Sequence, residues 1–229
     1  MTDIVALAEA NQRKAREVIA KLRVVEAWEA VGAEAHLVGS LRTGLLMKHR
    51  DIDFHIYSSP FRLSDSFAAM AALVADPAVK RFEGANLLHT PEACVEWHLW
   101  YDDGGEEWQV DMIHLVKGSR YDGYFERVAE RIEAVITPRQ RETVLRLKYE
   151  TPDDEKIMGI EYYLAVIRDG RLIRYLAPRS YLPGARPSFY HRLEDRVLLL
   201  TLIPGMGAEG LRLLKDSYQA VILQSFGVG

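Results

Sequence analysis

Apolar and polar residues follow two different periods along this chain of 229 residues, which places helices and strands in its first half. Between residues 3 and 32 the apolar positions recur every three or four residues, as in an amphipathic helix, and Gly32 is a typical helix end. Residues 51–57 instead alternate between polar and apolar, which is typical of a strand with one buried face. The same criteria predict a strand at 35–38 and helices at 41–47 and 64–74.

Two longer strands, 94–101 and 107–116, are joined by the sequence Asp-Asp-Gly-Gly, a typical hairpin turn. After residue 118 the strand pattern gives way to helical spacing. Helices are expected at 121–136, 138–149, 154–167, 189–202 and 208–225. We therefore predict an α+β fold, with a small mixed sheet and flanking helices in a first domain, 1–118, and an all-helical second domain, 119–229.

The composition is that of a globular protein without disulfides. Hydrophobic residues make up 48% of the chain and charged residues 27%, which is enough apolar material for a sizeable core. The one cysteine, Cys94, excludes an internal disulfide and a cysteine-based metal cage. The net charge is −4, and the acidic excess lies in the first half, which excludes the strongly basic surface of a general nucleic-acid binder.

No pattern in the chain indicates a membrane. The first residues lack a basic stretch followed by an apolar one, and the longest apolar stretch, near 197–203, is too short to span a bilayer. A cytoplasmic protein with no membrane partner is expected. Nothing in the sequence indicates its oligomeric state.

The first candidate functional residues follow the strand predicted at 35–38. Gly39 permits a sharp turn and a close backbone approach, and Ser40 is a residue type that favours the start of a helix. The first N–H groups of a helix are unpaired and its dipole is positive there, so this turn is suited to binding phosphate.

Two acidic residues follow at the start of the next strand. Asp51 and Asp53 are two positions apart, so both lie on one face, while Ile52 and Phe54 point to the other, which is the core. Two neighbouring carboxylates repel one another, and a divalent cation relieves that repulsion. Magnesium prefers a few carboxylate oxygens together with substrate phosphates. The stretch could therefore bind a triphosphate and a metal ion together.

A third acid, Asp111, interrupts an otherwise apolar strand. A carboxylate in such a setting needs a partner, either a metal ion or a cation, because burying an unpaired charge is costly. Glu96 and Glu107 are rival third acids with less apolar surroundings.

The arrangement resembles the signature of the polymerase-β-like nucleotidyltransferase superfamily: a hydrophobic residue, Gly-Gly or Gly-Ser, nine to thirteen residues, then Asp-hydrophobic-Asp-hydrophobic. The loop, with Gly39, Ser40, Arg42 and Gly44, and Lys48 shortly before Asp51, is especially similar to that of poly(A) polymerases. The resemblance covers about 20 contiguous residues and one further position.

The resemblance implies roles for these residues. Asp51 and Asp53 would hold two Mg²⁺ ions, and Asp111 would share one of them and help deprotonate the acceptor. Gly39 and Ser40 would grip the distal phosphates of the nucleotide. Arg42 and Lys48 are expected as auxiliary cations at the nucleotide, with ordinary surface charges as the alternative for both.

The expected reaction is transfer of a nucleoside monophosphate, AMP from ATP, to an acceptor hydroxyl with release of pyrophosphate. The acidic first half favours a small-molecule acceptor, and the loop similar to poly(A) polymerases favours an RNA end. A protein side chain also remains open as acceptor. The alternative from another class is a catalytically inactive module of the same fold that binds a nucleotide or another protein.

Two further patterns fit ordinary structural roles. The sequence Gly-Met-Gly-Ala-Glu-Gly at 205–210 spells a dinucleotide-binding fingerprint, which needs an acidic residue about 20 positions on. Only 19 residues of this sequence follow Gly210, and the last acidic one is Asp216, so a turn between helices is expected. His55 shares the strand face of Asp51 and Asp53, and polar packing is its expected role.

Overall fold

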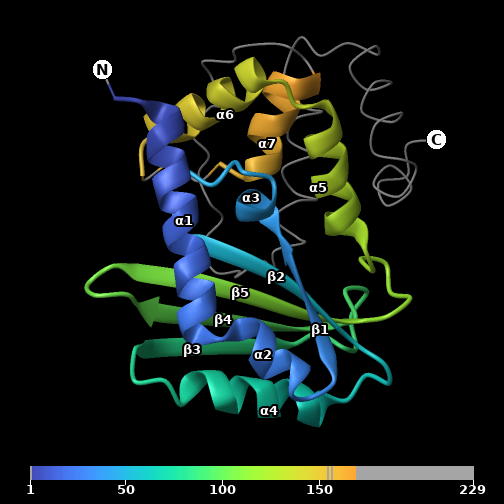
Figure 1. The fold of residues 1–229 in the computed structure, drawn as a ribbon. Coiled ribbons are helices and arrows are strands. Elements are labelled where there is room, and N and C mark those ends of the chain that lie inside the picture. The colour runs from blue at the N-terminus through green and yellow to red at the C-terminus, as the bar shows by residue number, and fades with distance from the viewer. Residues whose placement is uncertain (1, 154, 156, 169–229) are drawn as a thin grey trace, which may run out of the picture. The chain divides into compact units, whose positions relative to one another are not determined.

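The computed structural model of the protein describes residues 2–153, 155 and 157–168 (Figure 1). The predicted helices 189–202 and 208–225, and the predicted turn at 205–210, lie outside the described residues. The described elements are, in order, α1 (Ile4–Leu22), α2 (Val24–Glu29), β1 (Ala33–Val38), α3 (Gly39–Arg42), β2 (Asp51–Ser58), α4 (Leu63–Val74), β3 (Val79–Asn86), β4 (Cys94–Asp102), β5 (Glu107–Val116), α5 (Tyr124–Val135), α6 (Pro138–Glu150), α7 (Gly159–Tyr163) and a π-helical turn (Leu164–Arg168). Among them, no helix combines the length and the apolar character needed to cross a membrane.

The strands form one five-stranded sheet in the order β1-β2-β5-β4-β3. Strands β2 and β5 are parallel, and every other neighbouring pair is antiparallel. This mixed sheet with flanking helices confirms the predicted α+β class. The division at residue 118 stays a prediction, because the described residues on both sides of it belong to one compact unit of the chain.

The two faces of the sheet have different partners. Alternate residues of β2 and β5, such as Ile52, Phe54 and Met112, are buried on one face. Helices α1, α2 and α4 cover that face, and Trp28 of α2 is fully buried in the same cluster. Because successive strand residues point to opposite sides, the polar residues of β2 lie on the other face.

The helix predicted at 3–32 is two helices. Arg23 adopts a left-handed conformation with φ of 56°, and its N–H caps the carbonyl of Ile19, so α1 ends there and α2 leaves in a new direction. The turn lets Trp28 reach the core. Helical periodicity alone does not reveal such a break, since Arg23 is a good helix former.

Two other elements differ from the predictions. The helix expected at 41–47 is only the single turn α3, and the next residues form a loop. The helix expected at 154–167 begins later, at Gly159. Strand β3 was not predicted, because Lys80, Arg81 and Phe82 are all exposed and hide the alternation of a half-buried strand.

Side chains of α1 hold the loop between α3 and β2. The buried Gln12 donates from its amide to the carbonyls of Gly44 (3.0 Å) and Leu46 (3.1 Å). Asn11 donates to the carbonyl of Met47 at 2.7 Å. These bonds satisfy carbonyls that have no strand or helix partner, and they fix the path from Gly39 to Asp51.

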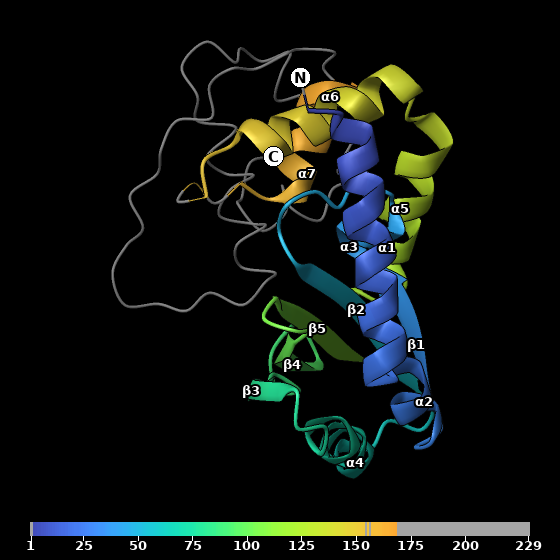
Figure 2. The same ribbon diagram turned by 60° about the vertical axis from the view of Figure 1, so that its left-hand side comes forward.

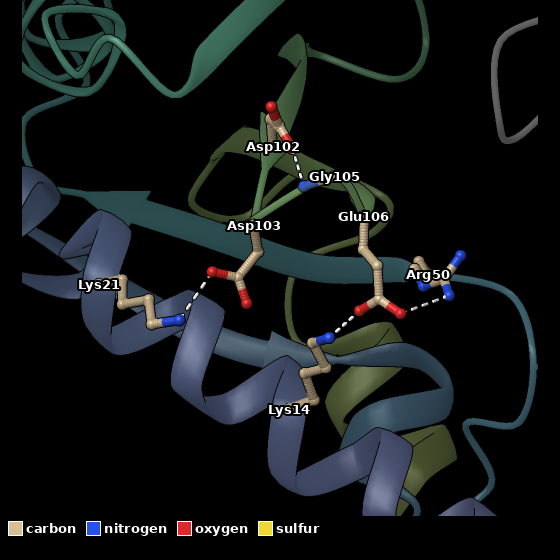
Figure 3. A network of polar contacts seen from close by, with 7 residues as sticks. All are labelled: Lys14, Lys21, Arg50, Asp102, Asp103, Gly105 and Glu106. Atoms are coloured by element: carbon tan, nitrogen blue, oxygen red, sulfur yellow. Dashed lines mark hydrogen bonds and ion pairs between the residues drawn. The ribbon is translucent and has the colours of Figure 1, made fainter.

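A group of ion pairs ties the β4–β5 hairpin to α1 and to the residue before β2 (Figure 3). Glu106 pairs with Lys14 of α1 and with Arg50, whose guanidinium lies 3.0 Å from it. Lys21 pairs with Asp103 at 2.6 Å. Arg50 directly precedes the first candidate carboxylate, so the hairpin and the start of β2 are joined at this point.

We expect Gln12→Leu to lower the free energy of unfolding by about 1–3 kcal/mol, because it leaves the carbonyls of Gly44 and Leu46 without their donor. Urea unfolding followed by circular dichroism measures the change. Arg13→Leu, on the exposed side of the same helix, is the control and should change stability by no more than about 0.5 kcal/mol. Equal effects of the two substitutions would contradict a supporting role for Gln12.

Candidate active site

The three candidate carboxylates lie on the same face of the sheet. Asp51 and Asp53 are on β2, and Asp53 is opposite Asp111 in the parallel register of β2 and β5. Asp51 is opposite Gln109, two positions before Asp111. Residues opposite one another in neighbouring strands point to the same side, so the fold brings together the three acids predicted from sequence.

Gly39 packs directly against one of these acids. It has a φ of +68°, and a Cβ added to it would lie 2.0 Å from Oδ2 and 2.7 Å from Cγ of Asp53. Both the backbone conformation and the contact therefore require glycine. Val38, the last residue of β1, lies opposite Asp53 of β2. The turn that begins at Gly39 therefore starts beside Asp53 and carries Ser40 next.

The two acids of β2 have raised pKa values. Burial is the main cause of the raised pKa of Asp51, and the charge of Asp111 adds to it. The pKa of Asp53 lies well above its usual value, through burial first and then repulsion by Asp51 and Asp111. The three carboxylates thus interact electrostatically, and a cation between them would relieve the repulsion.

Asp111 is held by two neighbours. The amide of Gln109 donates to Oδ1 (2.8 Å) and Oδ2 (3.1 Å) of Asp111. Nδ1 of His98, on β4, lies 2.8 Å from the same Oδ1 and acts as donor, since a carboxylate can only accept. In the described residues, no three Asp, Glu, His or Cys side chains form a metal-binding cluster. The oxygen chemistry of the three acids nevertheless fits a hard cation such as Mg²⁺.

Lys148 of α6 is a functional candidate that the sequence analysis missed. It is only 9% exposed, and its ammonium donates to the carbonyl of Leu45 at 3.0 Å. Its positive charge lowers the pKa of both Asp51 and Asp53, against the effect of burial. A signal existed in the sequence, because Lys148 falls four residues after the buried Val144, on the apolar side of its helix.

The two predicted auxiliary cations pair with residues that follow the sheet in the chain. Arg42 pairs with Glu133 of α5. Lys48 pairs with Asp153 at 2.7 Å and donates to the carbonyl of Thr151. Their predicted contact with a nucleotide stays a prediction.

A hollow of about 340 Å³ opens beside the starts of β2 and β5. It is lined by Lys48, His49, Arg50, Trp100, Glu107, Gln109 and Asp153. Its lining includes both basic side chains (Lys48 and Arg50) and acidic ones (Glu107 and Asp153), so it carries no strong charge of one sign. Through Gln109 it borders the carboxylate of Asp111.

The rival acids and His55 have other positions. Glu96 lies opposite Ile113 and Glu107 opposite Asp102, so neither faces Asp53 across a strand pair. His55 is 2% exposed, with its Nδ1 3.5 Å from the hydroxyl of Tyr57. Polar packing, the expected role of His55, agrees with this contact.

Solved structures with a similar arrangement include a cytoplasmic RNA terminal U-transferase, which is 17% identical, with a TM-score of 0.47, over 72% of this chain and 51% of that one. Another is Cid1, described by its RNA terminal uridylyl transferase activity, at 20% identity and a TM-score of 0.49 over 67% of this chain and 48% of that one. A third is the non-canonical poly(A) polymerase complex GLD-2–GLD-3, at 13% identity and a TM-score of 0.46 over 73% and 58% of the two chains. This chain thus spans about half the length of these structures, and likenesses this low carry no argument about substrate.

A search of curated proteins found no match. The family model described as "Nucleotidyltransferase domain" matches residues 19–169, about two thirds of the chain, including Gly39, Ser40, all three carboxylates and Lys148. The chain therefore belongs to the nucleotidyltransferase domain family.

Proposed function

We propose that this nucleotidyltransferase is magnesium-dependent and transfers AMP from ATP to a hydroxyl of a small acceptor molecule. The observation that carries the proposal is the contact of the Gly39 backbone with Asp53, on the sheet face shared with Asp51 and Asp111. It brings a phosphate-binding turn and a set of carboxylates within one site.

Asp51 and Asp53 would hold the magnesium ions, with Asp111 as a shared ligand. The ions would neutralise charge on the triphosphate and lower the pKa of the acceptor hydroxyl. The raised pKa values of Asp51 and Asp53 support this assignment, because a cation would offset both the burial of these carboxylates and the repulsion among the acids. The charge of Lys148 lowers both pKa values but does not cancel the increase.

The acceptor oxygen attacks the α-phosphorus, a new P–O bond forms, and the bond to the β-phosphate oxygen breaks to release pyrophosphate. The hydroxyl proton passes toward Asp111, whose orientation is set by Gln109 and His98. Ser40 and the backbone of Gly39 would bind the distal phosphates. Lys148, the buried cation near the carboxylates, would add a positive charge for the triphosphate.

The hollow beside Asp111 supports a compact acceptor. Its two strongest cations are already paired, Lys48 with Asp153 and Arg50 with Glu106. A polyanion such as RNA would have to displace these acids, whereas a small polar molecule would find donors and acceptors of both kinds. An RNA end and a protein side chain are the other acceptors that the experiment below distinguishes.

Incubation with Mg²⁺ and ATP labelled at the α-phosphate should transfer label to an acceptor from a panel of hydroxyl-bearing small molecules, short RNAs and proteins. Asp51→Ala/Asp53→Ala should abolish transfer, by about 10³-fold or more, because both principal metal ligands are lost. Glu34→Gln, an exposed substitution on β1, should leave transfer unchanged. Label transfer that survives the double substitution, or that requires RNA, would overturn the corresponding part of the proposal.

Asp53→Asn should raise the stability of the protein in EDTA at neutral pH. The folded state raises the pKa of Asp53, so the folded protein binds this proton more tightly than the unfolded chain, and stability falls as pH rises above the usual carboxyl range. The neutral amide of Asn removes the cost of burying an ionised carboxylate. The difference in stability between the variant and wild type should therefore shrink as the pH is lowered.

With Mg²⁺ present, wild type should become more stable than the Asp53→Asn variant. At 100 times its dissociation constant, Mg²⁺ should stabilise wild type by about 2.7 kcal/mol and the Asp53→Asn variant by much less. Thermal unfolding with EDTA or MgCl₂, at several pH values, measures both effects, with Glu34→Gln as the control. Equal stabilisation of wild type and Asp53→Asn by Mg²⁺ would argue against Asp53 as a ligand.

Gly39→Ala should reduce kcat by about 100-fold, because the new methyl group displaces the carboxylate of Asp53 by an ångström or more. Gly104→Ala is a matched control, since Gly104 also has a positive φ (+67°) but has no neighbouring atom within 4 Å of an added Cβ. Both variants share the backbone strain, so stability should fall in both, while activity should fall only in Gly39→Ala.

A further inference from the structure

Strand β3 forms an open edge of the sheet. It lies at the end of the strand order opposite β1, and in Figure 2 these two strands are at opposite sides of the sheet. It pairs with β4 on one side only, and within the described residues no strand pairs with its outer side. An open edge presents unpaired N–H and C=O groups and is a template for another strand.

Two exposed aromatic side chains lie close to this edge. Phe82 of β3 is 53% exposed and Phe67 of α4 is 56% exposed. The ring of Phe67 contacts that of Trp97 at 5.1 Å between centroids, and Trp97 covers Gly84, two positions from Phe82 on the same face. Exposed aromatic groups beside an open edge are typical of a surface that meets a partner.

The charges of β3 point to the identity of that partner. Arg81 and Glu83 flank Phe82 and share the opposite face of the strand, 3.4 Å apart. In an antiparallel pair of two identical strands centred on Phe82, each Arg81 lies opposite the Glu83 of the other copy. We propose that two copies of this protein associate along β3 in this register.

Neighbouring registers are disfavoured. Residues opposite one another in a sheet point to the same face, so the centre of a two-fold antiparallel pairing must lie on a residue. Moving that centre from Phe82 to the preceding residue places Arg81 opposite the Arg81 of the other copy. Moving it to the following residue places Glu83 opposite the other Glu83. Like charges directly opposite one another are destabilising, so the centre at Phe82 is selected.

The pairing has a simple geometrical consequence. A two-fold axis perpendicular to the sheet keeps each face on its own side, so the two five-stranded sheets become one continuous sheet. Both active sites then open on the same face, and Phe82 meets Phe82 on the helix-covered face.

Sedimentation equilibrium of the full chain tests the proposal, over protein concentrations from about 1 to 200 μM. Wild type should form a dimer in this range. Arg81→Glu and Glu83→Arg should each weaken the dimer at least tenfold, because each places like charges opposite one another. Arg81→Glu/Glu83→Arg restores opposite charges and should recover most of the wild-type association.

The recovery in the double variant separates pairing from local damage, because Arg81 also lies 3.5 Å above the ring of Trp100 and loses that contact in both Arg81 variants. Phe82→Asp should abolish the dimer, and Arg13→Glu, an exposed charge reversal on α1, should not affect it. Circular dichroism confirms folding of each variant. A wild type that stays monomeric throughout, or a double variant no better than the single ones, would overturn the proposal.

Discussion

The close contact between the backbone of Gly39 and the carboxylate of Asp53 is the constraint on which the site depends. It exists because β1 and β2 are antiparallel neighbours, so the turn that leaves β1 comes back over the start of β2. The parallel pairing of β2 with β5 then places Asp111 opposite Asp53. The turn at Gly39 and the three acids thus come together through the order of three strands.

Gathering three acids in one buried place lowers the stability of the folded protein, and neighbouring groups offset this only in part. The charge of Lys148 on α6 lowers the pKa of Asp51 and Asp53, and Gln109 and His98 hold Asp111. The remaining negative charge is the property that a site for cations and triphosphate requires, so the stability of the empty protein and its chemistry are opposed. This opposition is usual where charged groups of one sign are gathered for catalysis.

The sequence predicted what local patterns determine. The alternation of β2 and the spacing from Gly39 to Asp53 predicted the candidate site, and the apolar setting of Asp111 predicted a third acid, which the structure places opposite Asp53. Long-range interactions were not predictable: nothing near Lys148 in the chain shows that its charge acts on Asp51. The break at Arg23 and the exposed strand β3 were missed because local propensity continued the helix and charged residues masked the strand.

The loop from Gly44 to Met47 has a consequence for the limits of the catalytic unit. Its carbonyls are bound by Asn11 and Gln12 near one end of the chain and by Lys148 beyond the sheet. A fragment cut to residues 33–116, from the first strand of the sheet to the last, would keep every carboxylate yet lose both supports of the segment that spaces them. The smallest autonomous unit of this enzyme is therefore longer than its signature, extending from α1 through α6.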